Sequence, residues 1–169
     1  SPSRLLTHGQ ATASFVKNIE NDNWTKNYTF YDRKARPIAN HSINHLGGYT
    51  KTESILDFAG VPQKTFTYHK RKSTDAILQI NERFVYNQYN NILEKHYHEV
   101  VGKTPEELLT HNTYNEIGQL KTKKVGNNIQ EIDYAYNIRG WMTKINDPEN
   151  IGNKLFAYSI KYQDPENPT

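Results

Sequence analysis

The chain has 169 residues, with 21 Lys and Arg against 18 Asp and Glu, a net charge of +3 and no cysteine. This length fits one domain or a part of a larger repetitive one. The missing cysteine excludes disulfides and cysteine-based metal sites, and the small charge gives no reason to expect nucleic acid as a partner. No apolar run approaches the roughly 18 residues of a membrane span.

The composition is polar but rich in aromatic residues. Only 35% of the residues are hydrophobic, and the mean hydropathy is −0.89. The chain nevertheless carries 12 Tyr, 6 Phe and 2 Trp, whereas disordered chains are poor in aromatics. We therefore expect an ordered protein whose apolar surface is supplied largely by tyrosine. Because it opens Ser1-Pro2-Ser3 without Met, we expect it to be a piece of a longer protein.

Alternating polar and apolar residues predict antiparallel strands along most of the chain. Residues 1–30 read as a polar lead-in with one or two strands, and residues 31–169 as a repeat region. Lys70–Asp75 reads as a basic hairpin tip, and Thr104–Leu109 as one short turn of helix with an N-cap, an early proline and a capping-box Glu. The clearest strands are predicted at Lys64–His69, Ile92–Val100, Leu120–Val125, Ile132–Asn137 and Phe156–Tyr162.

Tight turns are predicted between these strands. Gly126-Asn127-Asn128 joins two of them as a hairpin. The sequence Asp-Pro-Glu-Asn, at Asp147–Asn150 and again at Asp164–Asn167, is typical of a type I turn.

A short phrase recurs at irregular spacing. It begins at residues 31, 56, 86, 114 and 136, so that the spacings are 25, 30, 28 and 22 residues. A residue that is Tyr in four of the five copies closes a strand, Asp or Asn follows, and Gly comes three residues later. Such an Asp or Asn can bond the backbone two residues on, and Gly accepts a left-handed conformation without cost.

The phrases fit this pattern to different degrees. Asp57 with Gly60, Asn115 with Gly118 and Asn137 with Gly140 fit it fully, after Leu56, Tyr114 and Tyr136. Asn87 with Asn90, after Tyr86, fits because Asn tolerates the left-handed region. Asp32 with Ala35, after Tyr31, departs from the pattern and makes the first turn doubtful.

These features predict an all-β fold, an antiparallel meander of β-hairpins that forms a twisted, curved sheet. A closed propeller is the alternative, although propeller blades need more regular spacing.

The serial phrases resemble the YD repeats of Rhs-family proteins. The resemblance runs from Tyr31 to the C-terminus, and the stretches Asn44–Glu53, Asn112–Gly126 and Tyr134–Pro148 look particularly like Rhs-type proteins of Bacteroidetes. It implies a large exported or cell-associated protein whose repeats coil into a hollow shell around a variable C-terminal segment, often a toxin. The family's self-cleaving core has no counterpart in this sequence, so the resemblance places this piece upstream of that core.

Few residues point to chemistry. His96 and His98 share one face of a predicted strand, but a metal site needs a third ligand from elsewhere, such as His41, His45, His69 or His111. No serine lies in a nucleophile-elbow context, and no glycine-rich phosphate loop exists. The basic segments at 70–72 and 121–124 read as solvated hairpin edges, with acidic glycans as the functional alternative. Trp24 and Trp141 are candidate glycan contacts, although packing between strands explains them more simply.

The sequence thus favours a non-catalytic wall segment of a YD-repeat shell, without cofactor or metal, secreted or at the cell surface by resemblance. Its expected partners are other repeats and the C-terminal segment of its own chain. The alternative is a cell-surface adhesion or carbohydrate-binding module. Because a piece cut from a sheet exposes strand edges, we expect the isolated chain either to form an edge-strand homodimer or to use residues 1–30 as a cap.

Overall fold

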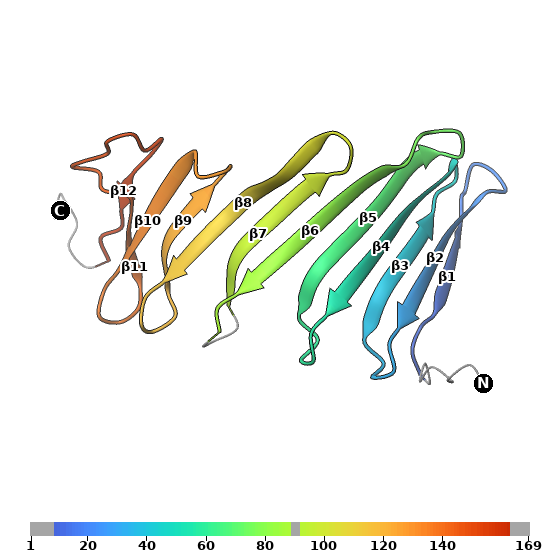
Figure 1. Ribbon diagram of the computed structural model, residues 1–169, viewed down its shortest axis with the longest axis horizontal. Helices are drawn as coiled ribbons and strands as arrows, with labels where there is room; N and C mark the ends of the chain where they lie inside the picture. Colours follow the sequence, from blue (N-terminus) through green and yellow to red (C-terminus); the bar gives the residue numbers. More distant parts are fainter. Residues whose placement is uncertain (1–8, 89–91, 163–169) are drawn as a thin grey trace. The chain divides into compact units, whose positions relative to one another are not determined.

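The computed structural model describes residues 9–88 and 92–162. Their strands form one twelve-stranded antiparallel sheet in which each strand is hydrogen-bonded to its neighbour in the sequence (Figure 1). The prediction of an all-β antiparallel meander is confirmed. No helix of the described residues is long and apolar enough to cross a membrane.

The chain divides into two compact units. The first comprises Ser1–Phe84 with His98–Glu106, and the second Val85–Tyr97 with Glu107–Thr169. The strands are β1 (Ala13–Lys17), β2 (Trp24–Tyr31), β3 (Pro37–Ile43), β4 (Gly47–Leu56), β5 (Pro62–Lys72), β6 (Leu78–Tyr86), β7 (Leu93–Val100), β8 (Thr104–Tyr114), β9 (Leu120–Val125), β10 (Gln130–Tyr136), β11 (Met142–Ile145) and β12 (Tyr158–Ser159).

Period-2 alternation located most strands well. The predictions inside β5, β7, β9 and β10 are confirmed, as is the hairpin at Gly126–Asn128, where the N–H of Ile129 donates to the carbonyl of Gly126. The strand predicted at Phe156–Tyr162 is wrong over most of its length, since only β12 forms there. The carbonyl of Phe156 accepts a bond from the side chain of Asn146 instead of a strand partner.

The predicted helical turn at Thr104–Leu109 is also wrong, because this segment begins β8. The hydroxyl of Thr104 accepts the main-chain N–H of Val100 across a hairpin turn, 3.2 Å away, rather than capping a helix. Two leucines are too few to give a helix an apolar stripe, and pairing with the neighbouring strands satisfies the backbone.

Neither unit has a dry core among the described residues. Tyr31, Gly48 and Asn146 are the buried residues there, and no described side chain is less than 2% exposed. In the first unit, the register makes the two faces of the sheet differ. One face carries hydroxyl and amide side chains in cross-strand rows, for example Ser14, Asn27, Ser42 and Thr50. We call this the hydroxyl face.

Candidate functional site

The recurring phrases fold into one repeated turn, and the turn at Asn137 shows its geometry. The N–H of Asn137 donates to the carbonyl of Trp141, and the N–H of Gly140 donates to the carbonyl of Asn137, both at 2.9 Å. The side-chain Oδ1 of Asn137 accepts the main-chain N–H groups of Arg139 and Trp141 at 2.9 and 3.0 Å. A single amide oxygen therefore closes the turn, as Asx side chains do.

Three further turns repeat this arrangement. In the turns that begin at Asp32 and Asn115, the four equivalent bonds measure 2.8–3.2 Å. The turn at Asp57 has both main-chain bonds and the bond from the N–H of Val61 to Oδ1 of Asp57, also within 2.8–3.2 Å. After each of the four turns the strand register shifts by one residue. The returning strand thus carries one extra residue, the mark of a β-bulge. The extra residues are Ile38, Gln63, Lys121 and Thr143.

The fourth turn residue is left-handed in every case. Gly60, Gly118 and Gly140 have φ values of 96°, 80° and 80°, which fits a type I turn followed by a left-handed residue in a three-residue hairpin loop. The doubtful first phrase forms the same turn, because Ala35 adopts a φ of 58° despite its methyl group. In the third phrase the N–H of Asn87 bonds the carbonyl of Ile92, whereas Asn90 lies outside the described residues.

One turn of the same kind has no phrase in the sequence. Between β3 and β4, the Oδ1 of Asn44 accepts the N–H groups of Leu46 and Gly48 at 2.9 and 3.0 Å. Gly47 has a φ of 74°. Asn44 follows Ile43 rather than an aromatic residue, so the phrase missed it, although the Asn-x-x-Gly spacing alone would have found it.

The tyrosines that close the strands tie each hairpin to the previous one. The hydroxyls of Tyr114 and Tyr136 donate to the carbonyls of Leu93 and Leu120, at 2.7 and 2.9 Å. Each acceptor is the first residue of the adjacent preceding strand. Tyr31 donates in the same way to the carbonyl of Ala11, and Tyr162 to that of Met142, both at 2.8 Å. Tyr86 ends β6.

Burial accompanies these tyrosine bonds. Tyr31 is the buried hydrophobic residue of the described part, and burial raises the pKa of the Tyr136 hydroxyl above its ordinary value. The raised pKa keeps the Tyr136 phenol neutral, so that it stays a hydrogen-bond donor at physiological pH.

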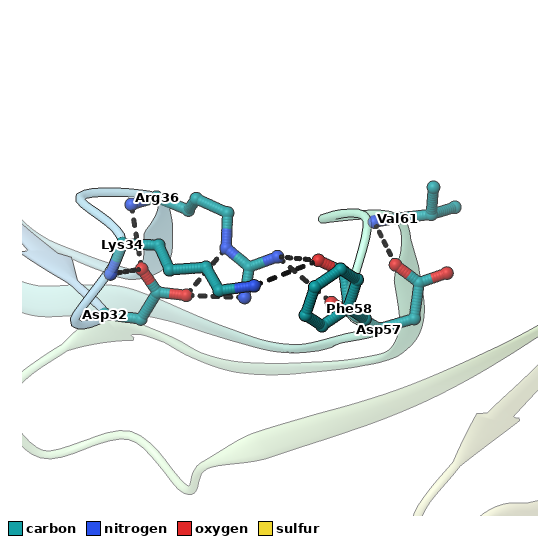
Figure 2. A network of polar contacts seen from close by, with 6 residues as sticks. All are labelled: Asp32, Lys34, Arg36, Asp57, Phe58 and Val61. Carbon is teal, nitrogen blue, oxygen red and sulfur yellow. Dashed lines mark hydrogen bonds and ion pairs between the residues drawn. The ribbon is translucent and has the colours of Figure 1, made fainter.

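Arg36 joins the first turn to the next one along the sheet (Figure 2). Its Nε donates to Oδ2 of Asp32 at 2.7 Å, and its Nη1 donates to the carbonyls of Asp57 and Phe58 at 3.0 and 3.1 Å. The Nζ of Lys34 lies 3.6 Å from the centre of the Phe58 ring, a cation–π contact. We call these five residues the turn latch.

Charge and hydrogen bonding reinforce the turn latch. The main-chain N–H of Arg36, above all, and then its guanidinium lower the pKa of the Asp32 carboxyl. In the second unit Gln119 occupies the position of Arg36, directly after the left-handed glycine. Its Nε2 donates to the carbonyl of Gly140 in the following turn, at 3.2 Å. Successive turns are thus bonded to one another in both units.

A second polar cluster fixes the C-terminal segment of the second unit. Asn146 is 5% exposed with a φ of 55°. Its Oδ1 accepts the N–H of Asp133 at 2.9 Å, and its Nδ2 donates to Phe156 at 2.7 Å. Lys154 pairs with the Asp133 carboxylate at 3.0 Å. No sequence motif marks Asn146, since its partners come from distant segments.

The candidate glycan contacts lie apart in the chain. Trp24 begins β2, and Trp141 follows the turn at Asn137; each is 43% exposed. The Trp141 ring packs against Tyr162 with centroids 5.1 Å apart, and the Arg139 guanidinium lies 5.3 Å from its centre. One side of Trp141 is therefore covered by protein.

Other candidate groups do not converge. No three His, Asp or Glu side chains gather into a metal site within 9–88 and 92–162, and His96 and His98 lie in β7. A hollow on the hydroxyl face is lined by Thr29, Asn40 and Thr52, without a titratable side chain. At the basic hairpin tip, Lys70 Nζ donates to the carbonyl of Ser73 at 2.7 Å.

Comparison with solved structures shows a distant similarity. The chain is similar to a chain in the crystal structure of TcdB2-TccC3-Cdc42, with a TM-score of 0.42 and 12% identity. The match covers 89% of this chain and 11% of that chain. No family model and no curated protein matches the chain. The function proposed below therefore depends on the geometry of the turns.

Proposed function

We propose that the chain is a non-catalytic wall segment of an Rhs/YD-repeat shell. This shell encloses the C-terminal segment of the full-length protein, and in proteins of this kind that segment is often a toxin. The observation that carries this proposal is the bonding between successive turns, through Arg36 in the first unit and Gln119 in the second. A hairpin in isolation is marginal in water. Side-chain bonds that run from hairpin to hairpin stiffen the sheet across its strands, as a wall requires.

The two faces of the first unit also suit a wall. The register separates hydroxyl and amide side chains from lysines and aromatic rings. A sheet in a globular domain buries one face, whereas the described strands keep both faces partly wet. The described part also holds no set of nucleophile, base and orienting acid that meets the geometric demands of catalysis. We propose further that the full-length protein is secreted or displayed at the cell surface.

Limited proteolysis tests the wall proposal. The full-length parent protein and its separately expressed C-terminal segment are treated with the same protease. We expect the segment to be cut when free and to survive within the intact chain. Equal cutting in both would reject enclosure and favour an adhesion role for the exposed faces. Cell fractionation of the source organism tests the location, and a purely cytosolic parent protein would contradict export.

A further inference from the structure

The face opposite the hydroxyl face combines lysines with aromatic rings. Register places Phe15, Lys26, Ile43, Tyr49 and Lys70 in one row across β1 to β5. Because residues directly opposite one another on paired strands point to the same face, these side chains share one surface. With the two neighbouring rows, we call it the lysine–aromatic face.

The neighbouring rows continue the pattern. On one side Lys17 pairs with Trp24, and Lys72 lies opposite Gly47. On the other side Tyr28, His41, Lys51 and Tyr68 form a row across β2 to β5. The three rows carry five lysines and no carboxylate over these five strands. This concentration of charge is not visible in the net charge of +3.

Two of the five lysines are neutralised from outside the rows. Lys17 pairs with Asp22 and Lys51 with Glu53, each at 2.7 Å. Within the described residues, no ion pair involves Lys26, Lys70 or Lys72. Phe15 and Trp24 beside them are 54% and 43% exposed. The surface thus offers three cations without an ion pair among exposed apolar rings, and the Lys70 ammonium also donates to the carbonyl of Ser73.

The arrangement of the rings decides between two kinds of acidic polymer. A polysaccharide stacks on open ring faces. Here Phe15 meets Tyr28 edge-on at 87°, and the ammonium groups of Lys51 and Lys70 lie 5.7 and 5.4 Å from the centres of the Tyr68 and Tyr49 rings. The faces of the Tyr68 and Tyr49 rings are therefore already shared with cations. Carboxylates pair with ammonium groups without needing a ring face, while apolar side chains pack on ring edges.

We propose that the lysine–aromatic face binds an acidic polypeptide, a chain rich in Asp and Glu with apolar residues between them. Its carboxylates pair with Lys26, Lys70 and Lys72, and its apolar side chains contact Phe15 and Trp24. The inference concerns a surface of this chain and stands whether or not the chain forms a shell wall.

The test measures binding of fluorescently labelled poly-L-glutamate to the purified chain by anisotropy. Replacement of Lys26, Lys70 and Lys72 by Gln is expected to weaken binding roughly tenfold at low salt, as the loss of three exposed ion pairs implies. A matched variant replaces Lys103, Lys121 and Lys123 by Gln, which lowers the net charge equally. It should stay within about twofold of the wild type, because its charges lie elsewhere.

Three results would overturn the proposal. Equal weakening by both triple variants would show an effect of net charge alone. Heparin binding that requires the three lysines, without poly-L-glutamate binding, would assign the face to a polysaccharide. Absence of binding by the wild type even at low salt, where screening is weakest, would leave the face without an acidic partner. Circular dichroism of each variant confirms that the sheet is intact.

Discussion

A single side-chain oxygen organises each repeated turn. Oδ1 of Asn137 accepts the N–H groups of Arg139 and Trp141. Asn137→Ala removes this acceptor, and water can still reach the two N–H groups that it leaves unpaired. We therefore expect the free energy of unfolding to fall by about 1 kcal/mol. Asn137→Asp keeps the oxygen and serves as the control. Urea denaturation measures both variants, and an equal loss in Asn137→Asp would contradict a role for the oxygen alone.

Two small substitutions at the left-handed position of the turn should change the stability of the chain in opposite directions. Ala35 has a φ of 58°, where a side chain is unfavourable, so Ala35→Gly should stabilise the chain by about 0.5–1 kcal/mol. Gly60 has a φ of 96°, and an added Cβ would lie 3.4 Å from Arg36. Gly60→Ala should therefore destabilise. Thermal unfolding of the two variants distinguishes the signs, and matching signs would refute this account of the turn.

Acid should weaken the turn latch through Asp32. The folded-state pKa of Asp32 lies below its ordinary value of 3.8. Its contribution to stability is therefore fully present above pH 3.8 and is lost as the pH falls through the lower folded value. Asp32→Asn keeps the turn acceptor and removes the charge. We expect the wild type to exceed this variant in stability at pH 6, and the difference to shrink as the pH falls below 3.8.

In that experiment the free energy of unfolding of the wild type minus that of Asp32→Asn is followed as a function of pH. Glu106 has a pKa lowered by its bond to Arg83, so acid also weakens the chain elsewhere. The loss of stability at Glu106 is the same in the wild type and in Asp32→Asn, so it cancels when one free energy of unfolding is subtracted from the other. A gap between Asp32→Asn and the wild type that stays constant from pH 6 to pH 2 would contradict the charge pairing with Arg36.

At the scale of the hairpin, the turn latch makes neighbouring turns depend on one another. Arg36→Ala removes the bonds to Asp57 and Phe58, and we expect a loss of about 2 kcal/mol in the free energy of unfolding. Arg71→Ala, at an exposed hairpin tip, should change it by less than about 0.5 kcal/mol. Chemical denaturation compares the two. Equal effects would mean that Arg36 acts only through its charge.

Local and non-local contacts explain which elements the sequence could predict. The turns at Asp57, Asn115 and Asn137 were predictable because Asx-x-x-Gly encodes its own bonds within five residues. The roles of Arg36 and Asn146 were not, since their partners lie 21 and 10 residues away across strands. The helix expected at Thr104–Leu109 failed for the same reason: a local capping pattern was overridden by pairing with adjacent strands.

The residues that gather on each face of the sheet could not be predicted either, because they too depend on non-local contacts. Alternation showed that each strand has two sides, but the gathering of Lys26, Tyr49 and Lys70 into one row depends on register. Register is fixed by turn length and by the bulge after the turns at Asp32, Asp57, Asn115 and Asn137. The phrase alone does not reveal that bulge.

For the whole chain, the outer edge of β1 should control association. The bonds from Asn18 to Asn23 and from Thr29 to Thr12 show that even-numbered residues of this segment face β2. Odd-numbered residues therefore present their N–H groups to the edge of β1 that no described strand pairs with. We expect concentration-dependent dimers of the wild-type chain, and monomers of Ala13→Pro, in light scattering.

Ser14→Pro is the matched control for that edge. It removes an N–H that faces β2 and should destabilise the first strand pair without protecting the edge. A wild-type chain that stays monomeric at high concentration would contradict pairing through β1. It would favour the expectation that residues 1–30 act as a cap.

The repeated bulge also limits how such a chain can change its length. Four turns share one loop geometry and one register shift. An insertion of one residue in a strand would exchange its two faces, whereas duplication of a complete hairpin preserves every register. The sheet can thus grow or shrink in steps of two strands. A gene of this kind can lengthen by copying hairpins while each new copy fits its neighbours without adjustment.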